Sequence, residues 1–159
     1  MNRDNHAGKI DMYSWVGGFF DGEGHLSLRK TYCSSRHTWI YQPLIVIVNT
    51  DKESLILIKE WLEKNGCKTN LNIRSQHLKN PTKWRPTWTL SLYGIKRVKI
   101  FLDLLGNYVI TKKNQVILVK EFITYRLSGN QRKTYTDFEP MMVEKIKALH
   151  HSKSPETTR

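Results

Sequence analysis

The chain has 159 residues, of which 39% are hydrophobic and 11% aromatic, enough for the core of one folded domain. Its 26 lysine and arginine residues outnumber 14 acidic ones, and the net charge of +12 favours a polyanionic partner, nucleic acid above all. Because no apolar run reaches the roughly 18 residues of a membrane span, and no signal peptide is evident, we expect an intracellular protein with no membrane partner.

Two periodicities of apolar residues alternate along the chain. A repeat every three or four residues indicates amphipathic helices, and a repeat every second residue indicates strands. In chain order they predict a helix at 11–21, strands at 25–33 and 39–49, a helix at 50–66, strands at 68–77 and 87–93, and helices at 95–106, 112–127 and 138–151. This order predicts an α+β domain at 11–151, with an N-terminal extension at 1–10 and a flexible tail at 152–159.

Single residues mark some of these boundaries. Thr50 or Asp51 is suited to cap the helix that follows, and Gly66 is suited to end it. Pro43 lacks the N–H group that strand pairing uses, so we expect its strand to lie at an edge or to carry a bulge.

Three of the four predicted strands carry hydrogen-bonding side chains opposite their apolar residues. Arginine reads guanine edges, and asparagine and glutamine read adenine edges, whereas a merely solvated face usually carries more glutamate and lysine. The strongest candidates for base contacts are Arg29 and Arg74, and an ordinary polar surface is the alternative. The full candidate DNA-binding set is Ser27, Arg29, Thr31, Asn70, Asn72, Arg74, Gln76, Thr87, Thr89 and Ser91.

The segment YSWVGGFFDGEG, at 13–24, combines features that weaken a helix. Two adjacent glycines each cost roughly 1 kcal/mol relative to alanine. Small residues on one stripe also let a second helix approach closely. We therefore expect a contact between two helices here, and packing of the helix on its own sheet is the alternative. The stripe consists of Ser14, Gly17, Gly18 and Asp21.

The acidic end of the same helix suits a cation. A carboxylate and unpaired helix carbonyls repel each other unless a cation lies between them, and Mg²⁺ binds carboxylate, phosphate and water oxygens. Glu23 and the Gly22 carbonyl would make half of such a site, which a DNA phosphate could complete. Asp21 is expected to cap or orient the turn. Ordinary turn residues are the alternative for both acids.

The nonapeptide VGGFFDGEG at 16–24 resembles the LAGLIDADG signature of homing endonucleases, with Glu23 at the catalytic acidic position. The predicted order of elements resembles that family's domain over residues 11 to about 127. The resemblance implies an αββαββα domain with a four-stranded antiparallel, saddle-shaped sheet in the DNA major groove and extra C-terminal helices. Glu23 replaces the aspartate of the family name, which a metal ligand tolerates.

The single motif implies a homodimer, because two such domains do not fit in this chain. By the same resemblance, the dimer would make a double-strand break in a long pseudo-palindromic DNA site. It would use Mg²⁺, with Mn²⁺ as an alternative, Ca²⁺ as a non-catalytic substitute and no organic cofactor. We expect an intron-encoded protein of a prokaryotic cytoplasm or of an organelle matrix or stroma.

The resemblance also implies further catalytic positions. A lysine that starts a later helix would lie near the scissile phosphate; Lys112 matches best, and its rival Lys113 is otherwise a DNA contact. A polar residue that organises water falls at Asn49 or Thr50. An arginine that some members carry about four residues later is replaced here by Ser54, which leaves that part of the pocket open.

Two other functions remain compatible with the pattern. A DNA-binding regulator with this fold would not need Glu23, and an RNA-splicing maturase could use the same fold without cleavage. The sequence lacks the E-x-K or D-x-K triplet of restriction-type sites, a zinc-binding framework and a P-loop.

Overall fold

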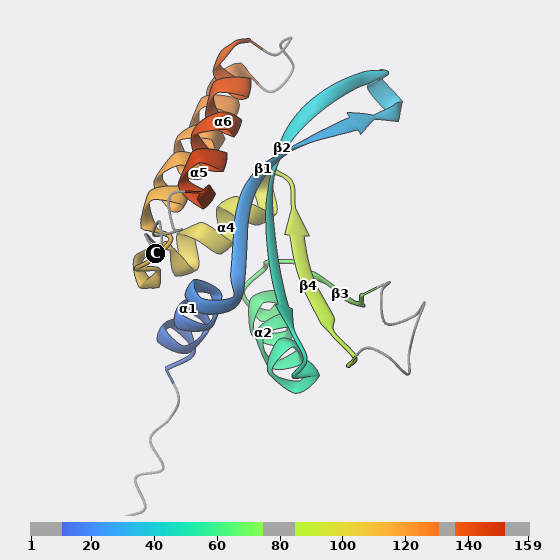
Figure 1. Cartoon of the computed structure of the whole chain (residues 1–159), viewed down its shortest axis with the longest axis vertical. Helices are drawn as coiled ribbons and strands as arrows, with labels where there is room; N and C mark the ends of the chain where they lie inside the picture. The colour runs from blue at the N-terminus through green and yellow to red at the C-terminus, as the bar shows by residue number, and fades with distance from the viewer. Residues whose placement is uncertain (1–10, 75–84, 131–135, 152–159) are drawn as a thin grey trace, which may run out of the picture.

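The computed structural model describes residues 11–74, 85–130 and 136–151 (Figure 1). The order of helices and strands is the predicted one, and the α+β class is confirmed. In chain order these are α1 (Met12–Glu23), β1 (Gly24–Cys33), β2 (Thr38–Asn49), α2 (Lys52–Lys64), β3 (Asn70–Ile73), β4 (Trp88–Tyr93), α4 (Ile95–Leu105), α5 (Lys113–Tyr125) and α6 (Phe138–His151). None of the described helices is long and apolar enough to cross a membrane.

The four strands form one antiparallel sheet in the order β1-β2-β4-β3, which confirms the predicted sheet. β1 pairs with β2 from Gly24 opposite Ile47 to Cys33 opposite Thr38. The pairing of β2 with β4 covers only the second half of β2 and begins at Leu44. The β1–β2 hairpin therefore extends beyond the rest of the sheet, toward the top of Figure 1.

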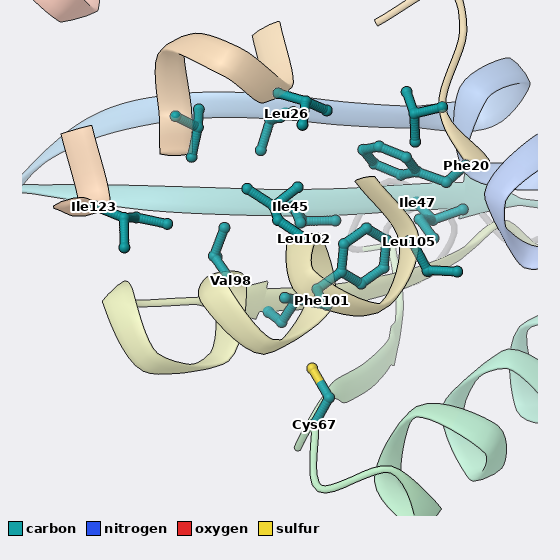
Figure 2. Close-up of a cluster of buried hydrophobic side chains, with 14 of the residues drawn as sticks. Phe20, Leu26, Ile45, Ile47, Cys67, Val98, Phe101, Leu102, Leu105 and Ile123 are labelled. Carbon is teal, nitrogen blue, oxygen red and sulfur yellow. The ribbon is translucent and has the colours of Figure 1, made fainter. Parts of the chain in front are cut away.

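One face of the sheet carries the hydrophobic core (Figure 2). Phe20 of α1 and Phe101 of α4 meet edge to face, with ring centroids 5.0 Å apart, between the helices and the strands. In Figure 1, α4, α5 and α6 lie together on this side, and α1 and α2 lie at the end opposite the hairpin. The strand residues of this core are Leu26, Leu28, Ile45, Ile47, Leu90 and Leu92.

Most elements differ from the prediction by one to a few residues at their ends, and α1 and β3 show why. α1 continues two residues further, to Glu23, because the Gly24 N–H still donates to the Phe20 carbonyl before the pairing of β1 begins. β3 ends at Ile73, and the predicted continuation falls largely outside the described residues. The predicted extension at 1–10 and tail at 152–159 also fall outside them.

Pro43 occupies a local edge within a central strand. Its carbonyl accepts a hydrogen bond from the Gly94 N–H at 3.0 Å, so its backbone polar groups face the β4 side. β4 ends at Tyr93, opposite Leu44, so no strand carbonyl on that side requires the N–H group that Pro43 lacks. The expectation that the strand of Pro43 lies at an edge or carries a bulge is therefore wrong: β2 is a central strand in regular register with β1, and it tolerates Pro43 because β4 ends one residue away.

Candidate active site and DNA-facing surface

Two of the glycines in and after α1 are required by contacts within the chain. A Cβ atom on buried Gly17 would lie 2.5 Å from the Cβ of Tyr108, and one on Gly24 would lie 2.1 Å from the Phe20 ring. Both distances are shorter than any non-bonded carbon contact. Gly17, which we expected to contact a second helix, is therefore accounted for by its own chain.

No contact among the described residues requires glycine at the other two positions, Gly18 and Gly22. A Cβ atom on Gly18 or Gly22 would meet no atom of the described residues within 4 Å, and both residues are exposed. Ser14, one turn before Gly18, is also exposed and donates its hydroxyl to Asp11 at 2.5 Å. The part of the small-residue stripe that remains on the surface is thus Ser14 and Gly18.

Asp21 joins the end of α1 to the start of α5. Its carboxylate accepts hydrogen bonds from the backbone N–H groups of Ile110 at 3.1 Å, Thr111 at 2.8 Å and Lys112 at 3.0 Å, and from the Thr111 hydroxyl at 2.8 Å. Partial burial raises the pKa of Asp21, but the hydrogen bonds from Thr111, Lys112 and Ile110 together hold it below its ordinary value. Asp21, also expected between two copies, thus orients a turn of its own chain.

The Asp21 contacts bring Lys112 to the end of α1. Its ammonium group donates to the Asp21 carbonyl oxygen and lies 5.9 Å from the centroid of the Phe20 ring. Lys113, the first residue of α5, is exposed. Of the two lysines predicted as rivals, Lys112 is the one held at the end of the motif helix.

Glu23 and Gly22 form the exposed end of α1. The Glu23 carboxylate makes no hydrogen bond or ion pair with any residue that the structure describes. The last carbonyls of a helix also lack partners within that helix. In the described ranges no three histidine, cysteine or acidic residues gather as a metal site. One copy therefore offers a carboxylate and carbonyl oxygens, hard donors that fit part of a Mg²⁺ site.

Asn49 is the last residue of β2 and lies at the end of the sheet where α1 leads into β1. It is two residues beyond Ile47, which pairs with Gly24. Its Oδ1 accepts from the Asp51 N–H at 2.8 Å, which leaves the side-chain NH₂ group as a donor. Ser54, where the resemblance expects an arginine, instead donates its hydroxyl to the Asp51 carboxylate at 2.5 Å and completes the cap of α2.

The predicted DNA-binding residues share the uncovered face of the sheet. Strand pairing aligns Ser91 with Asn70 and Thr89 with Asn72. The described helices lie on the opposite face or at the edges of the sheet, where His150 of α6 stacks on His25 of β1. Arg74 and Thr87 continue the face beyond the strands, joined by the Arg74 N–H and the Thr87 carbonyl at 2.8 Å. Gln76 lies outside the described residues. The members on β1 are Ser27, Arg29 and Thr31.

Solved structures share this architecture. I-CvuI, in complex with its target in the presence of 2 mM Ca, has a TM-score of 0.69 and 17% identity over 92% of this chain and 85% of that chain. The archaeal intron-encoded homing endonuclease I-Vdi141I, complexed with DNA, has a TM-score of 0.63 and 17% identity over 92% and 86%. The LAGLIDADG homing endonuclease I-GzeII, in complex with a DNA target, has a TM-score of 0.59 and 19% identity over 92% of this chain but 45% of that one.

The chain has the LAGLIDADG homing endonuclease fold. No protein-family model and no curated protein matches the sequence itself. The likeness is therefore one of structure, carried by nearly the whole chain.

The LAGLIDADG sheet of this chain has residues on its open face that sequence reasoning missed. Gln42 pairs with Arg29, and Leu44 pairs with both Ser27 and Tyr93. A hollow of about 260 Å³ lies among Arg29, Thr31, Gln42, Leu44 and Tyr93. The alternation was hidden because β2 carries apolar residues on both faces, and only its register with β1 reveals the open side.

His25, the first open-face residue of β1, is held by α6. Its ring stacks on His150, with centroids 4.5 Å apart, and His150 Nε2 donates to the Leu26 carbonyl at 3.1 Å. Partial burial, then the nearby His150 and Lys112, lower the pKa of His25 below its ordinary value. In this LAGLIDADG domain, the C-terminal helix thus supports the strand that follows the motif.

Proposed function

We propose that two copies of this chain form a metal-dependent homing endonuclease that cuts both strands of a long, pseudo-palindromic DNA site. The observation that carries the proposal is the Glu23 carboxylate, which is exposed at the end of the motif helix and has no partner among the residues that the structure describes. It stands beside Gly22, and Lys112 is anchored at the same helix end.

The uncovered surface of α1 supports a dimer. Gly18 weakens the helix, yet a side chain there would meet none of the described residues, so a contact with a second copy would explain it. Ile110, 81% exposed beside the Asp21 hydrogen bonds, adds apolar surface that a partner would bury. The match to nearly all of I-CvuI but to 45% of I-GzeII is the relation expected if two copies do the work of one longer chain.

The charge and the open face support DNA as the partner. The net charge is +12, and the open face carries arginine, asparagine and glutamine side chains suited to base edges. β1 has ten residues, so its length of about 30 Å matches about nine base pairs. Two sheets related by a two-fold axis would follow a site of about twice that length.

The residues present fit a divalent metal shared with DNA and the second copy. When bound, Mg²⁺ would lower the pKa of a bound water and neutralise charge on a phosphate oxygen. Glu23 and the Gly22 carbonyl would hold the metal. Lys112, fixed by Asp21, would direct positive charge at the scissile phosphate, and the Asn49 NH₂ group would hold a water in place.

The substitution Glu23→Gln tests the proposal. It keeps the shape of the side chain but removes its charge, so we expect cleavage in Mg²⁺ to fall by at least about 10³-fold while binding to the same DNA changes less than threefold. Glu60→Gln, an exposed glutamate on α2, is the matched control and should cut like the wild type. Cleavage that survives Glu23→Gln would refute the metal assignment.

A further inference from the structure

A second hollow opens where β4 ends. β4 stops at Tyr93 opposite Leu44, and the chain turns through Gly94 into α4, while β2 extends back to Thr38 with no strand on that side. The space left between the hairpin and the start of α4 measures about 580 Å³. We call it the notch; its lining includes Arg36, Gln42, Tyr93, Lys96 and Arg97.

The notch is strongly basic. Arg36 and Lys96 are exposed, and Arg97 is half-buried with its guanidinium 5.6 Å from the centroid of the Tyr93 ring. Among the described residues, no carboxylate forms an ion pair with any of these three cations. Like charges gathered around one hollow repel each other unless an anion compensates them.

A fourth basic residue in the lining, Arg126, does not add to this charge. Arg126 Nη1 lies 3.1 Å from the Glu139 carboxylate, and both side chains are buried. The positive charge available to a ligand in the notch therefore comes from the hairpin turn, through Arg36, and from the first turn of α4, through Lys96 and Arg97.

The notch is continuous with the open face of the sheet. Gln42 and Tyr93 line both the notch and the smaller hollow that contains Arg29 and Thr31. The pair Arg29–Gln42 lies five residues along β1 from Gly24, about 17 Å, or about five base pairs of DNA. A duplex that lies along the open face would thus reach the notch about five base pairs from the Glu23 end.

We infer that the notch binds backbone phosphates of the bound duplex through Arg36, Lys96 and Arg97, at a distance from the cleavage site. The inference rests on the proposed function only in taking DNA as the partner. Contacts to phosphates add affinity without reading sequence, and they release counterions. The notch would therefore hold the outer part of each half-site while the strands read its bases.

The double substitution Lys96→Gln and Arg97→Gln in the full chain tests this. Binding to a mixed-sequence duplex of about 40 base pairs is measured by fluorescence anisotropy in Ca²⁺ between about 50 and 200 mM salt. We expect affinity to fall at least about tenfold and the slope of log K against log salt to shrink by about 2, one phosphate per protomer. Wild-type affinity and slope in the double variant would overturn the inference.

Lys99→Gln is the control for charge on α4 outside the notch; it removes one positive charge, where the test variant removes two. Lys99 already pairs with Asp103 at 2.5 Å. Its affinity and slope should stay near those of the wild type, and an equal loss in this control would also overturn the inference. Arg36→Gln alone, on the hairpin, should also reduce the slope of log K against log salt. This variant replaces the α4 double variant as the test if the double variant unfolds. A lack of cleavage in Mg²⁺ would count against the proposed function alone, since this assay measures binding.

Discussion

Asp21 and Glu23 stand two residues apart at the end of α1 and have opposite environments. Asp21 is surrounded by donors from residues 110–112, whereas Glu23 contacts none of the described residues. A saturated carboxylate fixes structure, and an exposed one at a helix C-terminus is costly unless a cation approaches. The difference gives Asp21 a structural role and leaves Glu23 available as the proposed metal ligand.

The hydrogen bonds of Asp21 predict an acid-dependent stability. Because its folded pKa lies below the ordinary 3.8, its contribution to the free energy of unfolding is present above that pH and is lost as the pH falls through the folded pKa. Asp21→Asn should therefore cost about 1–2 kcal/mol near pH 7 and less below pH 3.8. Urea unfolding followed by circular dichroism at several pH values measures this; a cost that does not change with pH would contradict it. Asp103→Asn, on the surface of α4, is the control.

Lys112 and Lys113 make a matched pair of neighbours. Lys112 is held at the end of α1, so Lys112→Ala should slow cleavage at saturating DNA by about 10²-fold and weaken binding far less. Lys113→Ala should mainly weaken binding, as expected for an exposed phosphate contact. Single-turnover cleavage and equilibrium binding separate the two effects. A larger loss of binding than of rate in Lys112→Ala would make it a simple DNA anchor.

On strands with one apolar face, the alternation of apolar and polar residues predicts which face of the sheet a side chain occupies, as for Arg29 and Asn72. It could not identify Gln42, because β2 is apolar on both sides and its register is set by β1. The partners of Gly17 and Asp21 lie about 90 residues away in the chain, and no local pattern reports contacts at that separation. Long-range packing therefore decided those roles.

At the scale of elements, α1 combines a fully packed side with a bare one. Val16 and Phe20 are buried, and Gly17 touches Tyr108, whereas Ser14 and Gly18 face outward. Element order was predictable because helices and strands here have clear periods and caps, such as Asp51 at the start of α2. The ends of the elements were less predictable than their order, because the end of α1 depends on where the pairing of β1 with β2 begins.

The bare side of α1 predicts opposite effects on monomer and dimer. Gly18→Leu places a side chain in open space of the monomer and should raise its stability by up to about 1 kcal/mol through helix propensity. The same side chain should block close approach of a second helix and shift the protein to monomers. Sedimentation equilibrium distinguishes the forms, and Ala148→Leu, at an exposed position of α6, is the control. A dimer unchanged by Gly18→Leu would remove the packing argument.

At the scale of the whole molecule, one chain would present half of the proposed symmetric dimer. A single copy offers one exposed Glu23, one sheet whose length matches about nine base pairs of DNA, and one basic notch. Two-fold symmetry would place the two Glu23 residues near the centre of the DNA and the notches toward its ends. Fold, charge and the exposed acid then have one explanation.

The most direct test of this account is cleavage of a randomised duplex library by the wild-type protein, with the cut positions sequenced on both strands. A symmetric, metal-dependent endonuclease should cut in Mg²⁺ and not in Ca²⁺, at related sites with two-fold symmetry, with one cut on each strand near the centre. Binding to a selected duplex with no strand cut in either Mg²⁺ or Mn²⁺ would contradict it, and would favour a DNA-binding regulator built on the same fold.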